Sequence, residues 1–328
     1  MALIDQKITD RYAIYNGDCV EITDKIKKDS IHLSIYSPPF ADLYNYSSSE
    51  HDMSNCKSYD EFLDHYNFII EKIHSVTMRG RISAVHCMDI KRSDNNSAYR
   101  DFPGDIIRLH EKAGFYYMTR FCIWKEPFRV ALRTRALGLT HRQLIKDSTY
   151  SHNAGADYVL IFRKKGNNPI PVSHPDGLTH YAGTRDVPQD LLEKYTNGWE
   201  DQRTNKLSQW IWRQYASSHW DDIHGGNVLP YKEARDAEEE KHLCPLQLDV
   251  IERIIVLYSN AGEIILTPFA GIGSEVYEAL KLNRKAIGIE LKSSYYRQLL
   301  KNIDMLDLPE QINLFKEENN SIEDEIME

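Results

Sequence analysis

Apolar and polar positions alternate along the chain with two different periods. Residues 30–36 place isoleucine or leucine at every second position, which predicts a strand, and two prolines end this pattern. Residues 59–78 repeat apolar side chains at helical spacing, and Gly80 follows as a predicted helix stop. This part of the chain is therefore predicted to be a strand followed by a helix.

The same alternation continues toward residue 303. It predicts further strands at 81–87, 115–124, 157–163, 263–267 and 285–289, and helices at 104–113, 245–259, 275–282 and 292–303. Strands that alternate with helices predict an α/β fold, in which helices cover both faces of a mostly parallel sheet. Residues 166–241 are polar and irregular and contain Gly and Pro, so we interpret them as an insertion or small subdomain.

The composition is that of a globular protein. Of the 328 residues, 41% are apolar and 27% are charged, which supports a sizeable core and argues against wholesale disorder. No apolar run is long enough to span a membrane, and the first thirty residues contain no apolar signal-peptide core. The five cysteines are scattered without a C-x-x-C pair, so neither a disulfide framework nor a cysteine zinc site is expected, and no other metal site is predicted. We expect a cytoplasmic enzyme without a membrane partner.

The charge is unevenly distributed. The formal net charge is −9, and residues 309–328 hold seven acids against one lysine, which predicts an acidic and poorly packed tail. Residues 118–146 instead hold seven basic residues against one acid. A local basic face attracts phosphates whatever the total charge, although a solvated surface would have the same composition. The candidate phosphate contacts are Arg120, Lys125, Arg129, Arg133, Arg135 and Arg142.

Residues 267–274 lie between a predicted strand and a predicted helix and contain Gly271 and Gly273. Glycines at such a turn let a ligand approach the backbone, and Glu290 at the end of the next strand is placed to accept hydrogen bonds from ribose hydroxyls. Val276 occupies the position where a pyrophosphate-binding loop would have its third glycine. The pattern therefore indicates a nucleoside ligand without phosphates, and a tight turn in a core is the alternative.

Ser37, Pro38, Pro39 and Phe40 follow the strand predicted at 30–36. Ligands bind at the carboxyl ends of strands in open α/β sheets, and consecutive prolines fix the backbone rigidly. A serine hydroxyl and the Pro38 carbonyl can together accept both hydrogens of an exocyclic amine, while Phe40 offers a face for a planar base. A rigid turn that merely ends the strand is the alternative.

Taken in order, these motifs resemble those of the exocyclic-amino DNA methyltransferases, in particular the permuted beta class. The resemblance extends to about residue 308 and implies a Rossmann-like class I methyltransferase fold, S-adenosylmethionine as cofactor and DNA as partner. It implies catalytic roles for Ser37, Pro38, Pro39 and Phe40. The cofactor-binding residues that it implies are Asp18, Pro245, Gln247, Phe269, Gly271, Gly273, Ser274 and Glu290.

The resemblance also divides the chain. Residues 1–165 would form the catalytic half, 166–241 a target-recognition insertion, 242–308 the cofactor-binding half and 309–328 the flexible tail. The target base would flip out of the duplex, with Tyr44 or Tyr46 as a stacking partner. Whether the chain forms a homodimer or works with a restriction or defence component is left open.

The target base is the least constrained prediction. Serine at position 37 is commoner among enzymes that methylate cytosine N4, so this target is favoured by a small margin over adenine N6. Methylation of cytosine C5 is not expected, because no cysteine nucleophile stands near Ser37. An RNA or protein-amide methyltransferase and a non-catalytic DNA-binding relative are the more distant alternatives.

Overall fold

The computed structural model describes residues 3–39, 56, 58–92, 98–196, 201–234 and 245–306. Phe40, Tyr44, Tyr46 and the acidic tail lie outside these described residues. The strands are β1 (Leu3–Ile8), β2 (Tyr12–Gly17), β3 (Ile31–Tyr36), β4 (Thr77–Met88), β5 (Ile90–Lys91), β6 (Tyr99–Arg100), β7 (Phe115–Ile123), β8 (Asp157–Lys164), β9 (His219–Trp220), β10 (Ile264–Thr267) and β11 (Lys285–Glu290).

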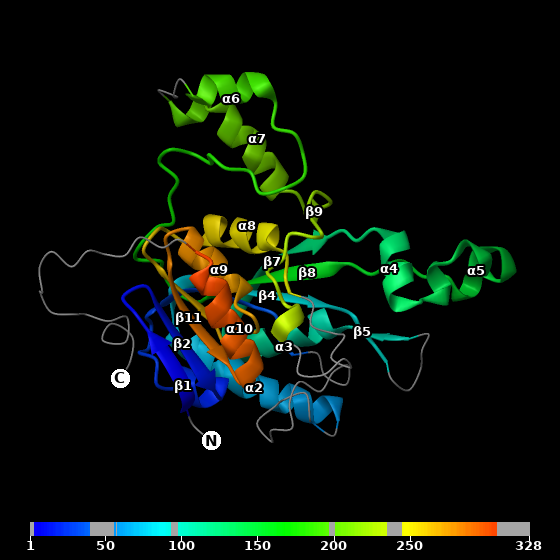
Figure 1. The fold of residues 1–328 in the computed structure, drawn as a ribbon, viewed down its shortest axis with the longest axis horizontal. Helices are drawn as coiled ribbons and strands as arrows, with labels where there is room; N and C mark the ends of the chain where they lie inside the picture. The colour runs from blue at the N-terminus through cyan, green and yellow to red at the C-terminus, as the bar shows by residue number, and fades with distance from the viewer. Residues whose placement is uncertain are drawn as a thin grey trace, which may run out of the picture.

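Nine of these strands form one sheet in the order β1-β2-β11-β10-β3-β4-β8-β7-β9 (Figure 1). The neighbours from β2 to β4 run parallel, whereas β8 runs antiparallel to both β4 and β7. The prediction of a mostly parallel sheet is confirmed. The sequence pattern missed β2, because all six of its residues are buried and a fully buried strand does not alternate polar with apolar positions.

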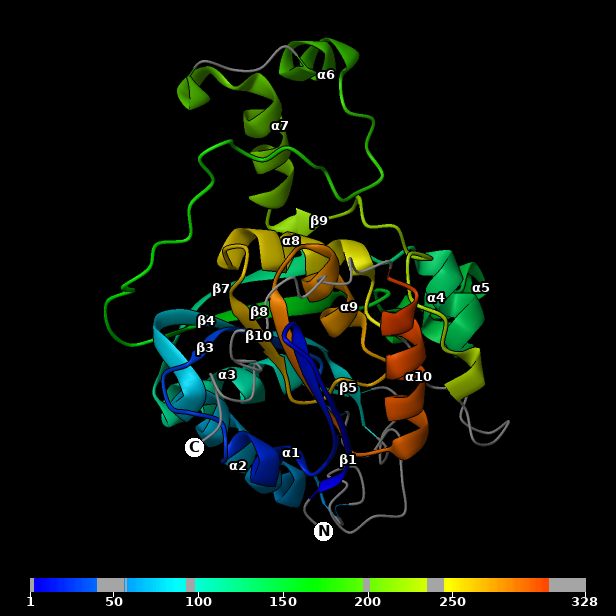
Figure 2. The same ribbon diagram turned by 60° about the vertical axis from the view of Figure 1, so that its left-hand side comes forward.

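Helices cover both faces of the sheet, as predicted (Figure 2). One face is covered by α1 (Cys19–Thr23), α2 (Tyr59–Val76) and α3 (Phe102–Ala113). The other face is covered by α8 (Leu248–Tyr258), α9 (Ser274–Lys281) and α10 (Ser293–Asp304). Each face of the sheet has a hydrophobic core of its own. Within β2, Ala13 and Tyr15 pack into the core beneath α1, α2 and α3, whereas Ile14 packs into the core beneath α8, α9 and α10. No helix in the described ranges is long and apolar enough to cross a bilayer.

The predicted helix stop at Gly80 is wrong. Helix α2 ends at Val76, and Gly80 lies inside β4 with a φ of +72°. A Cβ atom at this position would lie 2.5 Å from the backbone nitrogen of Asn168. Gly80 therefore permits a close backbone approach inside a strand and does not end a helix.

The predicted insertion is only partly separate from the sheet. Its helices α6 (Gln189–Thr196) and α7 (Lys206–Tyr215) project above α8, and α7 has a small core of its own (Figures 1 and 2). Strand β9, however, pairs with β7 in the main sheet. Trp220 is fully buried there, with its ring stacked on Phe121 at 4.4 Å. The short 3₁₀ helices η4 (Gln202–Thr204) and η5 (Lys232–Ala234) belong to the same segment.

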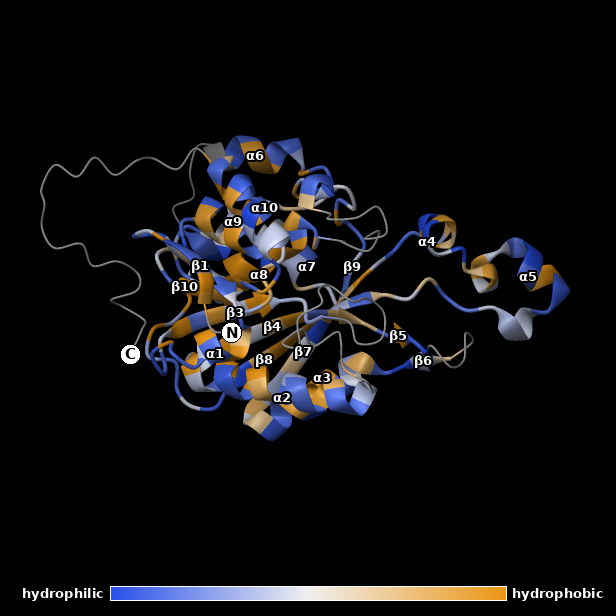
Figure 3. Ribbon diagram, turned by 60° about the horizontal axis from the view of Figure 1, so that its bottom comes forward, coloured by the Kyte–Doolittle hydropathy of each residue, from blue (hydrophilic) through white to orange (hydrophobic). Residues whose placement is uncertain are grey.

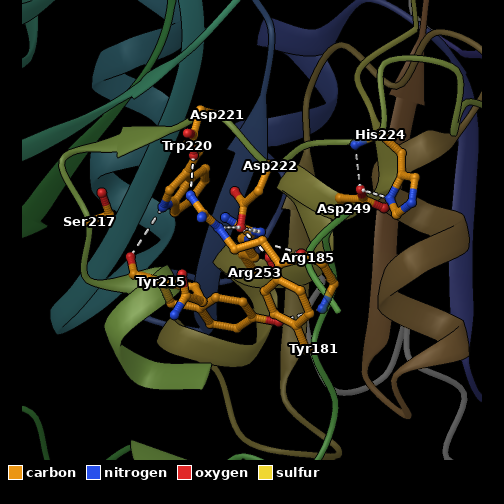
Figure 4. A network of polar contacts seen from close by, with 12 residues as sticks. Tyr181, Arg185, Tyr215, Ser217, Trp220, Asp221, Asp222, His224, Asp249 and Arg253 are labelled. Carbon is orange, nitrogen blue, oxygen red and sulfur yellow. Dashed lines mark hydrogen bonds and ion pairs between the residues drawn. The ribbon is translucent and has the colours of Figure 1, made fainter. Parts of the chain in front are cut away.

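A buried ion pair joins this segment to α8 (Figure 4). The Arg253 guanidinium lies 2.9 Å from the Asp222 carboxylate and donates a hydrogen bond to the Ala182 carbonyl at 2.8 Å. Tyr181 also donates a hydrogen bond to Asp222, and the guanidinium lies over the rings of Tyr181, Tyr215 and Trp220. The segment is therefore fixed to the helix that follows it in the chain.

A second extension leaves the sheet between β7 and β8. It contains α4 (Pro127–Thr134), η2 (Leu137–Leu139), α5 (His141–Lys146) and η3 (Ser148–Tyr150), and Figure 3 shows it projecting far from the sheet. None of these four elements has a buried residue. We call residues 124–156 the arm.

Candidate active site

The two predicted motifs meet at the carboxyl ends of two central strands of the sheet. Strands β3 and β10 are parallel neighbours, and the chain continues from β3 toward β4 on one side and from β10 toward β11 on the other. This point, where the strand order reverses, is where open α/β sheets bind ligands at the carboxyl ends of their strands. Tyr36 at the end of β3 and Phe269 after β10 have ring centroids 5.8 Å apart. The structure thus brings the serine–proline motif and the glycine-containing loop together.

Ser37 is half-buried directly after β3, followed by the buried Pro38 and the half-buried Pro39. The Ser37 hydroxyl lies 2.9 Å from Nδ1 of His86, which is a hydrogen-bonding distance. This contact follows from the sheet register, because β3 and β4 pair Tyr36 with Val85 and the next residues of both strands continue side by side.

His86 connects Ser37 to two buried charges. In the antiparallel pair β4–β8, His86 lies opposite Val159 and Met88 opposite Asp157, so His86 and Asp157 point to the same face of the sheet. His86 Nε2 is 3.5 Å from one Asp157 oxygen, and Lys125 Nζ is 2.5 Å from the other. The side chains of His86, Asp157 and Lys125 are 13%, 13% and 19% exposed.

The Asp157 carboxylate is ionised at neutral pH. Burial alone would raise its pKa, but the neighbouring His86 ring and the ammonium of Lys125 outweigh burial and lower the pKa to about 2. His86 and Asp157 were not predicted as site residues. A signal was present for His86, which lies near the end of a predicted strand, whereas Asp157 begins its strand and reaches this edge only because β8 runs antiparallel to β4.

The two glycines of the loop after β10 have different surroundings. Gly271 has a φ of +53°, and a Cβ atom there would meet no atom within 4 Å. Gly273 has a φ of +89°, but its Cβ atom would lie 2.6 Å from Cγ of the buried Leu299. Gly271 therefore borders open space, whereas Gly273 permits the close packing of the loop on α10.

Glu290 closes the same loop from the end of β11. Its Oε2 accepts a hydrogen bond from the Gly271 N–H at 2.7 Å, and its Oε1 accepts one from the Lys292 N–H at 2.8 Å. The amide of the buried Asn16 donates to the carbonyl of Glu290 at 2.8 Å and so fixes this strand end. A carboxylate has about four lone-pair sites, so Glu290 can accept further hydrogen bonds while it keeps these two.

The remaining predicted cofactor residues lie on three elements. Asp18 caps the N-terminus of α1, where its carboxylate accepts hydrogen bonds from Val20 and Glu21. Pro245 and Gln247 lie immediately before α8, which packs against β3 and α9. Ser274, the first residue of α9, is buried.

These surroundings suit a nucleoside-type cofactor. Thr267 and Ser274 have buried hydroxyl oxygens that make no hydrogen bond within the described residues, and both flank the loop that contains Gly271. Buried hydroxyls without partners require an explanation, and a polar ligand in the open space over Gly271 supplies one. The acid at Glu290 adds a group able to accept hydrogen bonds from a ribose.

The predicted phosphate contacts divide into two groups. Lys125 is half-buried and paired with Asp157, so its charge faces the Ser37–His86 site. The other five are exposed, on β7 or on the arm: Arg120, Arg129, Arg133, Arg135 and Arg142.

The arm also exposes large apolar side chains. They are Trp124, Phe128, Leu132, Leu137, Leu144, Ile145 and Tyr150, each more than half exposed.

The order of the strands and the helices on both faces of the sheet are those of a class I methyltransferase fold. The family described as DNA methylase, an N6/N4 methyltransferase family, matches residues 31–301. The chain therefore belongs to this family of DNA methylases, as its sequence motifs had indicated.

Similar proteins agree with this family. The type II methyltransferase M.BglI from Bacillus subtilis is 32% identical over a gapped alignment of 348 positions, which covers 95% of this chain and 92% of M.BglI. Among solved structures, TTHA0409 from Thermus thermophilus, described as a DNA modification methylase, superposes with a TM-score of 0.61 at 19% identity over 92% of this chain and 97% of that one. The cytosine-N4-specific PvuII DNA methyltransferase superposes with a TM-score of 0.59 at 16% identity over 92% of this chain and 88% of that one.

These matches confirm the predicted fold class. The predicted cofactor agrees with them too, since TTHA0409 has also been solved in complex with S-adenosyl-L-methionine.

Proposed function

We propose that this protein transfers the methyl group of S-adenosylmethionine to an exocyclic amino group of a base in DNA, with N4 of cytosine as the target. The observation that carries the proposal is that β3 and β10 end side by side, so that Tyr36, next to Ser37, lies 5.8 Å from Phe269 in the loop that Glu290 holds through Gly271. One motif can orient an amine, and the other can hold a nucleoside cofactor beside it.

The cofactor would supply an electrophilic methyl group on a sulfonium. On this proposal Glu290 accepts hydrogen bonds from the ribose hydroxyls, and the open backbone at Gly271 permits close approach of the ligand. Thr267 and Ser274 offer hydroxyls that have no other hydrogen bond among the described residues. Phe269, half-buried beside Tyr36, lies between the cofactor loop and the catalytic motif.

The exocyclic amine of a base is nearly non-basic, because its lone pair is delocalised into the ring. Catalysis must therefore come mainly from alignment and from preorganised acceptors. The Ser37 hydroxyl and the Pro38 carbonyl are the two acceptors that we assign to the amine hydrogens. A base in a duplex cannot reach them while it is stacked, so the target base must flip out.

The DNA is assigned to the side of the site that carries the arm. Five exposed arginines lie on β7 and the arm, and the arm begins close to the site because Lys125 pairs with Asp157. Arginine is suited to phosphate contacts, which position a protein on DNA without reading sequence. The unit formed by α6 and α7 is proposed to read base edges.

Cytosine is proposed as the target because Ser37 occupies the first position of the catalytic motif. The PvuII enzyme, which has a similar fold, is cytosine-N4-specific, and this supports the choice. Both cytosine and adenine present an exocyclic amine to the same two acceptors, so only the product can separate them.

The proposal is tested by incubating the protein with duplex DNA, RNA or protein and S-adenosylmethionine that carries a labelled methyl group. Labelled N4-methylcytosine in hydrolysed DNA, detected by nucleoside mass spectrometry, is the expected product. N6-methyladenine would overturn the choice of base and keep the reaction class. Label in RNA or protein but not in DNA would overturn the substrate. The Ser37→Ala variant is the matched control for contaminating activity.

A further inference from the structure

His86 stands between the Ser37 hydroxyl and the pair formed by Asp157 and Lys125. Its Nδ1 is 2.9 Å from Ser37 Oγ, and its Nε2 is 3.5 Å from an Asp157 oxygen. The other Asp157 oxygen is 2.5 Å from Lys125 Nζ. The side chains that make these three contacts are buried or half-buried. Ser37, His86, Asp157 and Lys125 come from four different parts of the chain, and the sheet brings them together.

The position of the hydrogens follows from the charges. An ionised carboxylate near Nε2 favours the imidazole tautomer that carries its hydrogen on Nε2, even though 3.5 Å is longer than a good hydrogen bond. Nδ1 then holds a lone pair and must accept the hydrogen of the Ser37 hydroxyl. A serine hydroxyl has one hydrogen and two lone pairs, so the lone pairs of Ser37 are left to face the substrate amine.

The opposite tautomer would spoil this arrangement. With its hydrogen on Nδ1, His86 would donate to Ser37, and the serine hydrogen would be free to point at the amine hydrogens. Ser37 would then be a poorer acceptor at the position where the amine has to be oriented.

We propose that His86 is a positioning residue that fixes Ser37 as a hydrogen-bond acceptor and takes up, through Ser37, the proton that methyl transfer releases. This inference rests on the proposed function of the site. Asp157 and Lys125 set the tautomer of His86 and do not touch the substrate. Ser37 is not a nucleophile in this scheme.

The proton balance is complete with these groups. As the nitrogen–methyl bond forms and the methyl–sulfur bond breaks, the positive charge moves from sulfur to the amine nitrogen. The methylated amine must then lose one proton to become neutral. That proton passes to Ser37 Oγ while the serine's own hydrogen passes to His86 Nδ1. The product amine is neutral, and the imidazolium that forms faces the Asp157 carboxylate until the proton leaves to solvent.

The first test needs no activity. Nitrogen NMR of the protein with labelled histidine, without cofactor or DNA, reports which ring nitrogen of His86 is protonated, and the His86→Asn variant identifies the signal. A neutral ring with hydrogen on Nε2 is expected. Hydrogen on Nδ1, or on both nitrogens, would overturn the proposal. In Asp157→Asn the expected tautomer should no longer dominate, because the carboxylate that favours it is gone.

The second test is a double-mutant cycle on the single-turnover rate of methyl transfer to DNA. Ser37→Ala should slow transfer by roughly 10²–10³-fold and His86→Ala by about 10²-fold. Because His86 acts through Ser37, the double variant should be no slower than Ser37→Ala alone. Losses that multiply would show an independent or merely structural role for His86 and overturn the inference.

Folding and function are kept apart by two controls. The Ser37 and His86 variants should each unfold in one cooperative transition and bind the cofactor with wild-type affinity. If His86→Ala does not fold, His86→Asn and His86→Gln replace it, because the asparagine oxygen occupies the place of Nδ1 and the glutamine oxygen that of Nε2. His86→Asn should then be the faster of the two, and the reverse order would contradict the proposal. A wild-type protein that methylates no DNA would refute the proposed function itself, whereas an active wild type with multiplying losses refutes only the role of His86.

Discussion

Oε2 of Glu290 accepts a hydrogen bond from the backbone N–H of Gly271 at 2.7 Å. The acid at the end of β11 therefore holds the shape of the loop after β10, in addition to its proposed contact with the ribose. Replacing Glu290 should affect both the loop and the ligand. The two effects can be measured separately, since only one of them requires the cofactor.

We expect Glu290→Gln to weaken cofactor binding by about tenfold or more, because a hydrogen bond to a charged group contributes about 1.5–3 kcal/mol. In wild type the backbone N–H groups of Gly271 and Lys292 each donate to one Glu290 oxygen. Glutamine has only one oxygen, so one of these hydrogen bonds is lost and the loop should be less stable. Calorimetric titration with S-adenosylhomocysteine measures the first effect, and thermal unfolding without ligand measures the second. Unchanged affinity in a folded variant would remove Glu290 from the cofactor site.

The two glycines of this loop form a matched pair of variants. In Gly271→Ala the new methyl group enters open space, so the protein should fold with a cost of about 1–2 kcal/mol from the positive φ and lose affinity for the cofactor. In Gly273→Ala the methyl group meets Leu299, so the fold itself should be destabilised further, by about 1–3 kcal/mol of overpacking.

Urea unfolding and cofactor titration of both variants check this pair. A Gly271→Ala protein that binds cofactor normally would contradict the assignment of the open space. A carboxylate at Gly273 would meet the same contact with Leu299, so Gly273→Asp should destabilise the fold in addition to any effect on the cofactor.

The sequence predicted those parts of the site that lie within one motif. Ser37 and Glu290 each follow a strand with clear periodicity, so their place at the carboxyl edge could be inferred before the sheet order was known. The chain order of the motifs supplied the family, which the comparisons confirm.

Sequence could not predict contacts that depend on strand register. His86 and Asp157 are 71 positions apart in the chain and meet because β4 and β8 pair with Met88 opposite Asp157. Lys125 shows the same limit: its charge suggested a phosphate contact, whereas the fold pairs it with Asp157. Gly80 was likewise misinterpreted as a helix stop, because the atoms that require glycine there belong to Asn168, and the packing of Gly273 against Leu299 could not be foreseen for the same reason.

The buried Asp157 should make stability depend on pH in the acid range. Its pKa is depressed from an ordinary value of 3.8 to about 2, so the stabilisation is complete above pH 4 and is lost as pH falls toward 2. The shift corresponds to about 2 kcal/mol. Asp157→Asn should be less stable than wild type at pH 5, and the difference should shrink by about this amount at pH 2. Urea unfolding at a series of pH values measures it, and a difference that stays constant would show that Asp157 is not held ionised by its neighbours.

The arm provides the test of how DNA is bound. Arg129→Ala and Arg142→Ala each remove one exposed positive charge from it. If these residues contact phosphates, both variants should bind all duplex sequences more weakly, and the slope of log affinity against log salt should fall by about one for each.

The matched control is Lys125→Ala, which also removes one positive charge, but one that is already paired with Asp157. We expect the control to leave the salt slope unchanged and to slow methyl transfer instead, because Asp157 loses the ammonium that helps to keep it ionised. Fluorescence anisotropy with a labelled duplex at several salt concentrations gives the slopes. Equal slopes for wild type and both arginine variants would place the DNA elsewhere, and a reduced slope in Lys125→Ala would mean that this lysine contacts a phosphate directly.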